Sequence, residues 1–212
     1  MTLTWGAVVL AAGAGSRMGT RPKCLLQLEG QPLIARHLDA LASVGAASVC
    51  VVLGHHAPAI QQAVPGARCV FNPAADEGQN GSLHLGLQAL PDGLDAVVVV
   101  LADQPLVNAS ALSDLLHAFE TRQTSTEVLL PWNADQQVPG NPVAFSARVR
   151  RDILQAPAQW GCKQWQQAHP AQVQRWATRQ AAYFTDLDTP QDLEAFAKRT
   201  GHQLSWPPDL GD

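Results

Sequence analysis

Short apolar runs alternate with amphipathic stretches along most of this 212-residue chain. Such alternation is typical of a parallel sheet covered by helices, because a strand buried on both faces is a continuous aliphatic run. The predicted strands are Ala7–Leu10, Ser48–Leu53, Arg68–Phe71, Ala96–Leu101 and Val128–Leu130. The predicted helices are Pro32–Ser43, Ala57–Ala63, Ser82–Leu90, Ser110–Thr121 and Pro190–Lys198. The pattern therefore predicts an α/β domain with a mostly parallel sheet.

The composition fits one domain with a large core. Hydrophobic residues make up 46% of the chain and charged residues 15%, so disorder is not expected. The net charge of -4 argues against a nucleic-acid-binding protein, which usually carries a basic stripe. No stretch reaches the roughly 18 apolar residues of a membrane span, and no basic region precedes the first apolar run. We therefore expect a cytoplasmic protein that binds neither nucleic acid nor membrane.

A glycine-rich loop with two cations follows the first predicted strand. Gly13, Gly15 and Gly19 lie on this loop together with Arg17 and Lys23. Glycines permit positive φ and let backbone N–H groups point into one concavity, where they bind an anion. The spacing fits neither the dinucleotide fingerprint nor the P-loop. We interpret the loop as a triphosphate cradle; the alternative is a turn that only links a strand to a helix.

The loop resembles the signature of the MobA-like nucleotidyltransferases, which include molybdenum cofactor cytidylyltransferase. The similar residues are Leu10-Ala11-Ala12-Gly13, Ser16-Arg17-Met18-Gly19 and Lys23. The resemblance implies a Rossmann-like three-layer fold with a mixed, mostly parallel sheet. It also implies that Arg17 and Lys23 hold nucleotide phosphates. The nucleotide-binding residues on the loop would be Leu10, Ala11, Ala12, Gly13, Gly15, Ser16, Arg17, Met18 and Lys23.

One position in this loop bears on the choice of nucleotide. The related guanylyltransferases usually have Leu-Ala-Gly-Gly where this chain has Leu-Ala-Ala-Gly, with Ala12 as the difference. By resemblance, Ala12 favours CTP over GTP. A guanylyltransferase of the same family remains an alternative.

Asp103 follows the most aliphatic predicted strand, Ala96–Leu101. A carboxylate at the end of a buried strand is costly to desolvate unless a cation or a donor meets it. Mg²⁺ with nucleotide phosphates is a natural partner, since this ion binds one or two carboxylates and keeps phosphate and water as its other ligands. The alternative is that Asp103 caps the next helix, although Asn108 or Ser110 lies closer to that start. The family resemblance also assigns the metal to Asp103.

A second carboxylate segment, Asp186-Leu187-Asp188-Thr189-Pro190, precedes the last predicted helix. Asp188 or Thr189 could cap that helix, where proline is favoured at the first position. Asp186 and Asp188 would point the same way on an extended chain. The family has a similar Asp-x-Asp-Thr-Pro segment, and the resemblance assigns Asp188 as the second Mg²⁺ ligand.

Two further segments match the family in part. Gly78 and Ser82 match residues beside the nucleotide, although Ser82 could also be a helix N-cap. Gly140, Asn141 and Pro142 resemble the element near which the second substrate enters. The later family motif is altered, with Gln159 in place of an aspartate, Gly161 kept and Lys163 in place of an arginine. The expected acceptor-binding residues are Gly140, Asn141, Pro142 and Lys163.

These observations predict a single domain over residues 1–200. The polar segment 132–142 is expected to be a loop that separates a nucleotide half, about 1–131, from an acceptor half, about 132–200. Residues 201–212 are expected to form an irregular tail. Trp160, Trp165 and Trp176 are candidates to line an aromatic acceptor pocket, with packing in the core as the alternative.

The resemblance implies a cytidylyltransferase that transfers CMP from CTP to a phosphorylated pterin cofactor and releases pyrophosphate. The catalytic residues would be Arg17, Lys23 and Asp103, with Mg²⁺ as cofactor and a recipient molybdoenzyme as a possible partner. Two alternatives stay open besides the guanylyltransferase. One is a transferase acting on a sugar or polyol phosphate, and the other is a non-catalytic carrier of the finished molybdenum cofactor. A nucleophilic role for Cys24 is not expected, because no base lies near it in the sequence.

Overall fold

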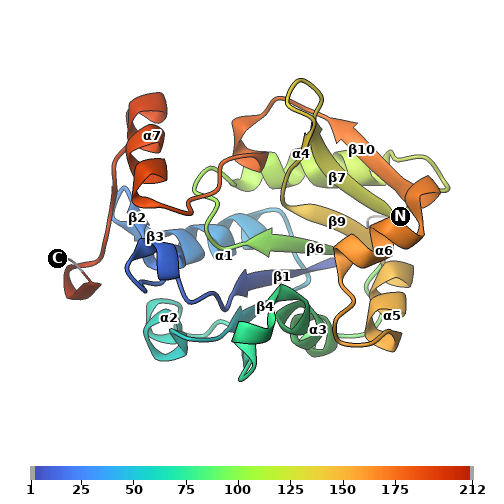
Figure 1. The fold of residues 1–212 in the computed structure, drawn as a ribbon. Coiled ribbons are helices and arrows are strands. Elements are labelled where there is room, and N and C mark those ends of the chain that lie inside the picture. The colour runs from blue at the N-terminus through green and yellow to red at the C-terminus, as the bar shows by residue number, and fades with distance from the viewer. Residues whose placement is uncertain (1–2, 211–212) are drawn as a thin grey trace.

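The structure is a computed structural model that describes residues 3–210. Its main sheet has the strand order β10-β7-β9-β6-β1-β4-β5, with the short β8 paired to β7 (Figure 1). These strands are β1 (Trp5–Ala11), β4 (Ser48–Leu53), β5 (Cys69–Phe71), β6 (Ala96–Leu101), β7 (Val128–Asn133), β8 (Val138–Pro139), β9 (Val143–Ser146) and β10 (Val173–Ala177). The β9 strand runs antiparallel to both β6 and β7, whereas β5, β4, β1 and β6 run parallel to one another, and β10 runs parallel to β7. The expected mixed, mostly parallel sheet is confirmed.

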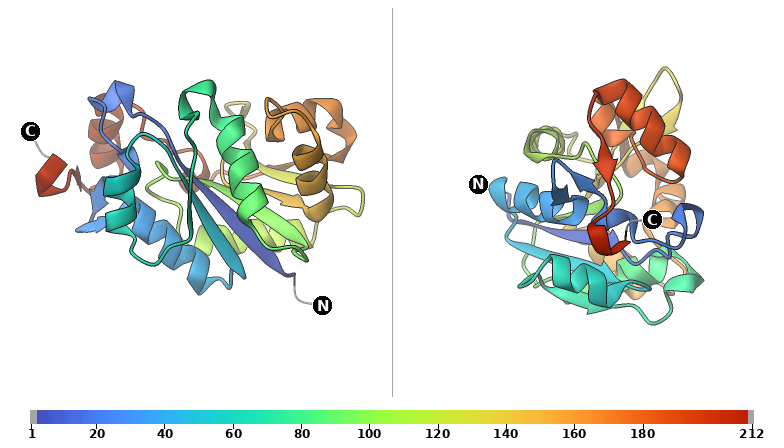
Figure 2. Two further views of the ribbon diagram at one scale, coloured as in Figure 1. Left: turned by 90° about the horizontal axis from the view of Figure 1, so that it is seen from below. Right: turned by 90° about the vertical axis from the view of Figure 1, so that its left-hand side faces the viewer.

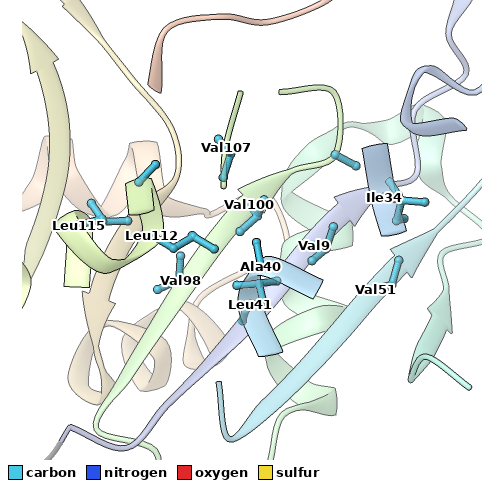
Figure 3. Close-up of a cluster of buried hydrophobic side chains, with 14 of the residues drawn as sticks. Val9, Ile34, Ala40, Leu41, Val51, Val98, Val100, Val107, Leu112 and Leu115 are labelled. Atoms are coloured by element: carbon cyan, nitrogen blue, oxygen red, sulfur yellow. The ribbon is translucent and has the colours of Figure 1, made fainter. Parts of the chain in front are cut away.

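Helices cover both faces of this sheet. The helices are α1 (Leu33–Ser43), α2 (Ala57–Ala63), α3 (Gln79–Ala89), α4 (Ala109–Glu120), α5 (Ala147–Gln155), α6 (Cys162–Ala168) and α7 (Pro190–Thr200). Helices α1 to α6 lie against this sheet, whereas α7 packs on a small second sheet. Side chains alternate across a strand, so Val9 packs with α1 and α4 on one face and Val8 packs with α3 on the other. Figure 3 shows the first of these clusters, in which Leu41 and Leu112 approach Val98 and Val100. The expected three-layer arrangement is thus observed.

Parallel pairing brings the carboxyl ends of β1 and β6 to one edge of the sheet. Leu10 is in register with Leu101, so the glycine loop and Asp103 leave the sheet side by side. The Ala102 amide donates to the Leu10 carbonyl at 3.2 Å, which continues the pairing beyond the last strand residue. Ligands of open α/β sheets bind outside the carboxyl ends of the strands. The fold therefore places the predicted nucleotide loop and Asp103 at the edge where a ligand is expected.

The segment 132–142 is not a plain loop, which corrects the prediction. Trp132 and Asn133 continue β7 and pair with Pro139 and Val138 of β8, so that a hairpin projects from the sheet. The strand β8 has only two residues, too few for alternation to reveal it. The strands β9 and β10 and the helices α5 and α6 were also not predicted from the sequence.

Residues 201–210 are also more ordered in structure than the expected irregular tail. The strand β11 (Leu204–Ser205) pairs antiparallel with β2 (Gln27–Leu28), which pairs with β3 (Gln31–Pro32). A third hydrophobic cluster, which includes Met18 and Phe196, lies between this small sheet and α7. Residues 211 and 212 lie outside the described part of the chain. Among residues 3–210, no helix combines the length and apolar character needed to cross a membrane.

Candidate active site

A cavity of about 230 Å³ opens at the carboxyl ends of β1 and β6. Four segments form its wall: the glycine loop, the end of β6, the short 3₁₀ helix Ala75–Glu77 and the start of α3. Its lining residues are Leu10, Ala11, Ala12, Gly13, Gly15, Pro22, Lys23, Cys24, Ala75, Gly78, Gln79, Ser82, Leu101, Ala102 and Asp103. The structure thus gathers most of the predicted nucleotide residues around one space. Ser16, Arg17 and Met18 do not line it, and the Met18 side chain is buried in the third hydrophobic cluster.

Glycine is required at one turn of the loop. Gly15 has φ +64°, and a Cβ atom there would lie 2.0 Å from the Arg21 carbonyl oxygen. The Gly15 carbonyl accepts hydrogen bonds from the amides of Met18 and Thr20 at 2.8 and 3.0 Å. The loop therefore folds back on itself at Gly15, and this close approach leaves no room for a side chain.

A charged cluster closes one side of the cavity. The Lys23 ammonium donates to the Asp103 carboxylate and, at 2.8 Å, to an Asp188 oxygen. Arg17 reaches the same Asp188 oxygen at 3.0 Å. The residues predicted as phosphate ligands and those predicted as metal ligands therefore lie in direct contact.

One backbone hydrogen bond and one side-chain hydrogen bond hold the segment that contains Asp186 and Asp188 against the end of β6. The Leu187 amide donates to the Asp103 carbonyl at 3.2 Å. The buried Gln104 side chain donates to an Asp186 carboxylate oxygen at 2.9 Å. Asp186 and Asp188 therefore do not share one partner: Asp186 bonds Gln104, and Asp188 faces Lys23. Thr189 is the N-cap of α7 and forms a capping box with Asp192, so Asp188 is not needed for that role.

Burial and charge shift the proton equilibria of this cluster. Burial lowers the pKa of Lys23, but the Asp103 and Asp188 carboxylates outweigh it and raise that pKa above its usual value, so the ammonium stays charged. Burial and the neighbouring Asp103 charge raise the pKa of Asp186. Burial also raises the pKa of the Cys24 thiol to about 12. A protonated, buried thiol is a poor nucleophile, in line with the expectation for Cys24.

The donor set at this cluster fits a hard divalent cation. Carboxylate oxygens of Asp103 and Asp188 converge on one cationic centre, the Lys23 ammonium, which marks a position favourable for positive charge. Such oxygens are the protein ligands that Mg²⁺ prefers, usually one or two of them with phosphate and water. Within residues 3–210, no three His, Cys, Asp or Glu side chains form a ready-made metal site. These two aspartates are therefore the protein donors available to a metal that is bound with a nucleotide.

The start of α3 supplies the opposite wall. Gly78, with φ +112°, is the N-cap residue of α3, so the alternative role of Ser82 as N-cap is wrong. Ser82 lies inside the first turn of the helix, where its hydroxyl accepts a hydrogen bond from Asn72 at 2.9 Å. Its side chain is buried and lines the cavity. This arrangement fixes the Ser82 hydroxyl beside the space that a nucleotide would occupy.

A second, larger cavity of about 820 Å³ lies next to the first, and the two share Leu10, Gln79 and Leu101. Its floor, defined here as the buried lining side chains Leu83, Val99, Leu130 and Val143, is aliphatic, and its rim, the exposed lining side chains, includes the cations Lys163 and Arg175. Its lining also includes Asn80, Leu83, Val99, Leu130, Trp132, Pro139, Gly140, Asn141, Val143, Cys162, Lys163, Gln166, Gln167, Pro170, Val173 and Arg175. Gly140, Asn141 and Lys163, which were expected to bind the acceptor, are therefore gathered here, while Pro142 is buried beside the cavity and does not line it.

Close packing explains the glycine before Asn141. A Cβ atom at Gly140 would lie 2.6 Å from the Tyr183 carbonyl oxygen and 2.7 Å from the Phe184 ring. The Asn141 amide donates to that same Tyr183 carbonyl at 2.9 Å. The turn therefore anchors the wall of the second cavity to the segment that leads to Asp186.

The altered segment 158–163 docks on the start of α3. The Asn80 side chain donates to the Gln159 carbonyl at 2.5 Å, and the His84 ring lies 2.7 Å from the Trp160 carbonyl oxygen. A Cβ atom at Gly161 would lie 2.2 Å from the Asn80 side-chain oxygen. The Gln159 side chain is exposed. The helix that carries Ser82 thus also holds the segment that carries Lys163.

The sequence did not reveal the aromatic wall of the second cavity. Trp165 is buried in the core and Trp176 packs edge-on against Tyr183, so neither lines the cavity, and Trp160 does not line it either. Trp132 does, and the Arg175 guanidinium lies 4.2 Å from the centre of its ring. Trp132 follows a predicted strand, so its place at a carboxyl end was the available signal. Arg175 lies on β10, which was not predicted.

Known proteins resemble this chain in sequence and in fold. Residues 7–173 match the family model of the MobA-like NTP transferase domain. Among curated proteins, the chain is 36% identical over 115 residues to the bifunctional protein GlmU of Heliobacterium modesticaldum. That alignment covers 54% of this chain and 25% of GlmU, so the chain spans about a quarter of the length of this curated relative.

Two solved structures are similar over nearly the whole chain. Rv0371c from Mycobacterium tuberculosis superposes with a TM-score of 0.74 and 26% identity, covering 93% of this chain and all of that one. A nucleotidyl transferase from Methanothermobacter thermautotroptrophicus gives 0.73 and 25%, with coverages of 92% and 97%. A further structure of Rv0371c is its complex with manganese, at 25% identity and a TM-score of 0.71, covering 92% of this chain and 98% of that one.

Proposed function

We propose that this chain, which belongs to the MobA-like NTP transferase family, transfers CMP from CTP to a phosphorylated acceptor and releases pyrophosphate. The molybdopterin cofactor is the acceptor we favour. The observation that carries the proposal is the contact between Lys23 and both Asp103 and Asp188 at the mouth of the first cavity. This contact joins a phosphate-binding cation to two oxygen donors at one point. The nucleotide half is residues 1–131 and the acceptor half is residues 132–200.

The first cavity accepts the nucleotide in this proposal. The glycine loop surrounds the triphosphate with backbone N–H groups, and Arg17 and Lys23 pair with its oxygens. Arg17 is 65% exposed at its side chain, so it is free to swing from Asp188 to a phosphate. Gly78 and Ser82 lie beside the base and ribose. Ala12 stands where the related guanylyltransferases usually have glycine, and by this resemblance CTP is the preferred nucleotide and GTP the alternative.

The chemical step needs no general base. An oxygen of the acceptor phosphate attacks the α-phosphorus of CTP, a new P–O bond forms, and the bond to the β-phosphate bridging oxygen breaks. The electron pair leaves with pyrophosphate, whose growing charge is met by Lys23 and Arg17. Asp103 and Asp188 would hold Mg²⁺, which neutralises phosphate charge when bound and orients the phosphates for in-line attack.

In this proposal, the acceptor substrate binds in the second cavity. Its aliphatic floor suits the face of a flat ring system, the amide side chains in its lining suit polar groups at the edge of that ring, and Lys163 and Arg175 on its rim suit a phosphate. Trp132 offers a ring face for stacking. A free sugar phosphate would use the cations but would leave the floor and the Trp132 face unmatched. These features favour a phosphorylated heterocycle such as a pterin.

Turnover of the Asp103→Ala variant tests the proposal. The purified wild type with CTP, Mg²⁺ and a molybdopterin-type acceptor is expected to form the cytidylylated acceptor. The Asp103→Ala variant should fold and lose this product, whereas Asp114→Ala, which removes an exposed carboxylate on α4 that lines neither cavity, should keep it. Wild-type turnover by Asp103→Ala would contradict the proposed metal site. Acceptor binding without any product in the wild type would instead support a non-catalytic carrier.

A further inference from the structure

Residues 201–210, here called the tail segment, lie against the glycine loop. The strand β11 in this segment pairs Leu204 with Leu28 and Ser205 with Gln27. Figure 2 shows, in its right-hand view, the red tail segment running beside the blue N-terminal residues. The tail segment lies outside residues 7–173, which the family model matches.

Arg21 links the tail segment to the loop. Its guanidinium lies 4.5 Å from the centre of the Trp206 ring and donates to the Leu210 carbonyl at 3.4 Å. The same side chain donates to the Met18 carbonyl at 3.1 Å. Its own carbonyl occupies the space that a Cβ atom at Gly15 would fill. One residue therefore touches the loop at two points and the tail segment at two more.

Hydrophobic packing also joins the tail segment to the glycine loop. Met18, at the centre of the loop, is 1% exposed. It lies in the third hydrophobic cluster, against which Leu204 and Trp206 pack from the tail segment. Two contacts therefore hold the loop. The Arg21 guanidinium lies against the Trp206 ring, and the Met18 side chain lies in the third hydrophobic cluster. A cation above an aromatic face and a buried apolar contact both favour a single loop conformation.

We propose that the tail segment is a clamp that positions the glycine loop, with Trp206 acting through Arg21. Trp206 is a positioning residue, because it contacts Arg21 and the third cluster rather than the first cavity. Its effect on nucleotide affinity rests on the proposed function. Its hold on the loop does not, and it can be measured by a separate method.

Trypsin provides that method, because Arg17–Met18 is a cleavable bond inside the loop. Arg21–Pro22 resists trypsin, so its cleavage does not interfere. Cleavage inside an ordered loop requires local opening, so its rate reports how firmly the loop is held. Arg179–Gln180, in an exposed segment of the acceptor half, serves as an internal reference. Trp206→Ala is compared with Trp206→Phe, which keeps an aromatic face, and with Gln203→Ala, an exposed change in the same tail segment.

The clamp predicts that Trp206→Ala accelerates cleavage at Arg17–Met18 by about three- to tenfold, in the range of one lost cation–π and apolar contact. Cleavage at Arg179–Gln180 should not change, Gln203→Ala should behave as wild type, and Trp206→Phe should recover most of the protection. The dissociation constant for CTP, measured by titration, should rise by a similar factor in Trp206→Ala.

An unchanged rate at Arg17–Met18, or an equal acceleration at Arg179–Gln180, would overturn the clamp. If Trp206→Ala does not fold, Arg21→Lys takes its place, because it keeps the charge and loses the planar stacking group. Faster loop cleavage in that variant supports the clamp, and wild-type cleavage overturns it. Should the wild type bind no CTP while loop cleavage still accelerates, the proposed function fails and the clamp stands.

Discussion

The Lys23 ammonium lies 2.8 Å from an Asp188 carboxylate oxygen, although 165 positions separate the two residues. The same ammonium donates to Asp103, so one cation joins the glycine loop, the end of β6 and the segment before α7. The three side chains are 19%, 22% and 40% exposed for Lys23, Asp103 and Asp188. This partial burial strengthens their attraction compared with a surface ion pair, so the contact organises the site as well as carrying its charge.

Replacing Lys23 should therefore affect stability as well as binding. We expect Lys23→Met to lower the free energy of unfolding at pH 7 by about 1–3 kcal/mol, discounted from a fully buried pair because the partners are partly exposed. CTP binding should be lost in the same variant. Urea unfolding and CTP titration measure the two effects. Lys198→Met, an exposed change on α7, is the control and should alter stability by less than about 0.5 kcal/mol. Wild-type stability of Lys23→Met would contradict the structural role.

Arg175 should set affinity for the acceptor. Removing its charge and its contact with Trp132 in Arg175→Met should raise the KM for the acceptor by about tenfold, which corresponds to about 1.4 kcal/mol. The KM for CTP should stay unchanged, because Arg175 lines the second cavity and not the first. Steady-state kinetics with each substrate varied separately measure the split. Arg179→Met, which removes an 83% exposed arginine paired with Asp135, is the matched control. An equal rise of both KM values would argue against the assignment.

Arg150 stabilises the fold away from both cavities. Its buried guanidinium donates to the carbonyls of Leu87, Leu90 and Pro91 at the end of α3. Arg150→Met should destabilise the protein by about 2–4 kcal/mol, because the helix-end carbonyls lose their donors. Arg150→Lys should recover only part of this, since a single ammonium cannot reach all three. Chemical denaturation measures the loss, and kcat well below the unfolding temperature should be unchanged. A stable Arg150→Met protein would refute this role.

His37 should make the protein sensitive to acid. Burial, with the nearby Arg36 charge, lowers the pKa of His37 to about 4, below its ordinary value of 6.5. The unfolded chain therefore binds a proton more readily than the folded one between these values. The contribution of His37 to stability is complete above pH 6.5 and is lost as the pH falls towards 4, by about 3 kcal/mol at most.

The His37→Leu variant tests this pH dependence. The Val107 backbone lies near the His37 ring and partly offsets the lowering of its pKa, but neither ring nitrogen makes a well-formed hydrogen bond within residues 3–210, so leucine removes the titration with little loss of hydrogen bonding. Free energies of unfolding are measured for both proteins from pH 7.5 to pH 4.5. The difference between the two curves should grow in favour of the variant as the pH falls. Parallel curves over this range would exclude His37 as the source.

Most of the nucleotide half was predictable from the sequence. The aliphatic run Ala96–Leu101 forms β6 with the expected bounds, because a strand buried on both faces leaves little choice of residue type. The glycine loop and Asp103 lie at one sheet edge, because the parallel register of β1 and β6 requires it. The contact of Lys23 with the two aspartates was not foreseen, since they were assigned to different ligands.

The acceptor half was less accessible from the sequence. The helix α5 is rich in arginine, and one of these, Arg150, is buried because carbonyls at the end of α3 accept hydrogen bonds from its guanidinium. The strand β10 is an edge strand with the sequence Val-Gln-Arg-Trp-Ala, which does not alternate between apolar and polar residues and therefore gives no strand signal. Trp206 and Arg21 are far apart in the sequence, so their contact depends on tertiary structure and cannot be predicted from local patterns. Of the missed residues of the second cavity, Arg175 lies on β10, and Trp132 lies at the end of β7, just beyond the predicted strand Val128–Leu130.

Pyrophosphate release tests the central claim most directly. The purified protein is incubated with Mg²⁺, a molybdopterin-type acceptor and either CTP or GTP, with acceptor omitted in a parallel reaction. We predict that pyrophosphate is released with CTP only when the acceptor is present, and that little is released with GTP. Release with GTP but not with CTP would support nucleotidyl transfer and contradict the role of Ala12 in the choice of nucleotide. No release with either nucleotide, from a folded protein that binds CTP, would contradict the assignment of the acceptor.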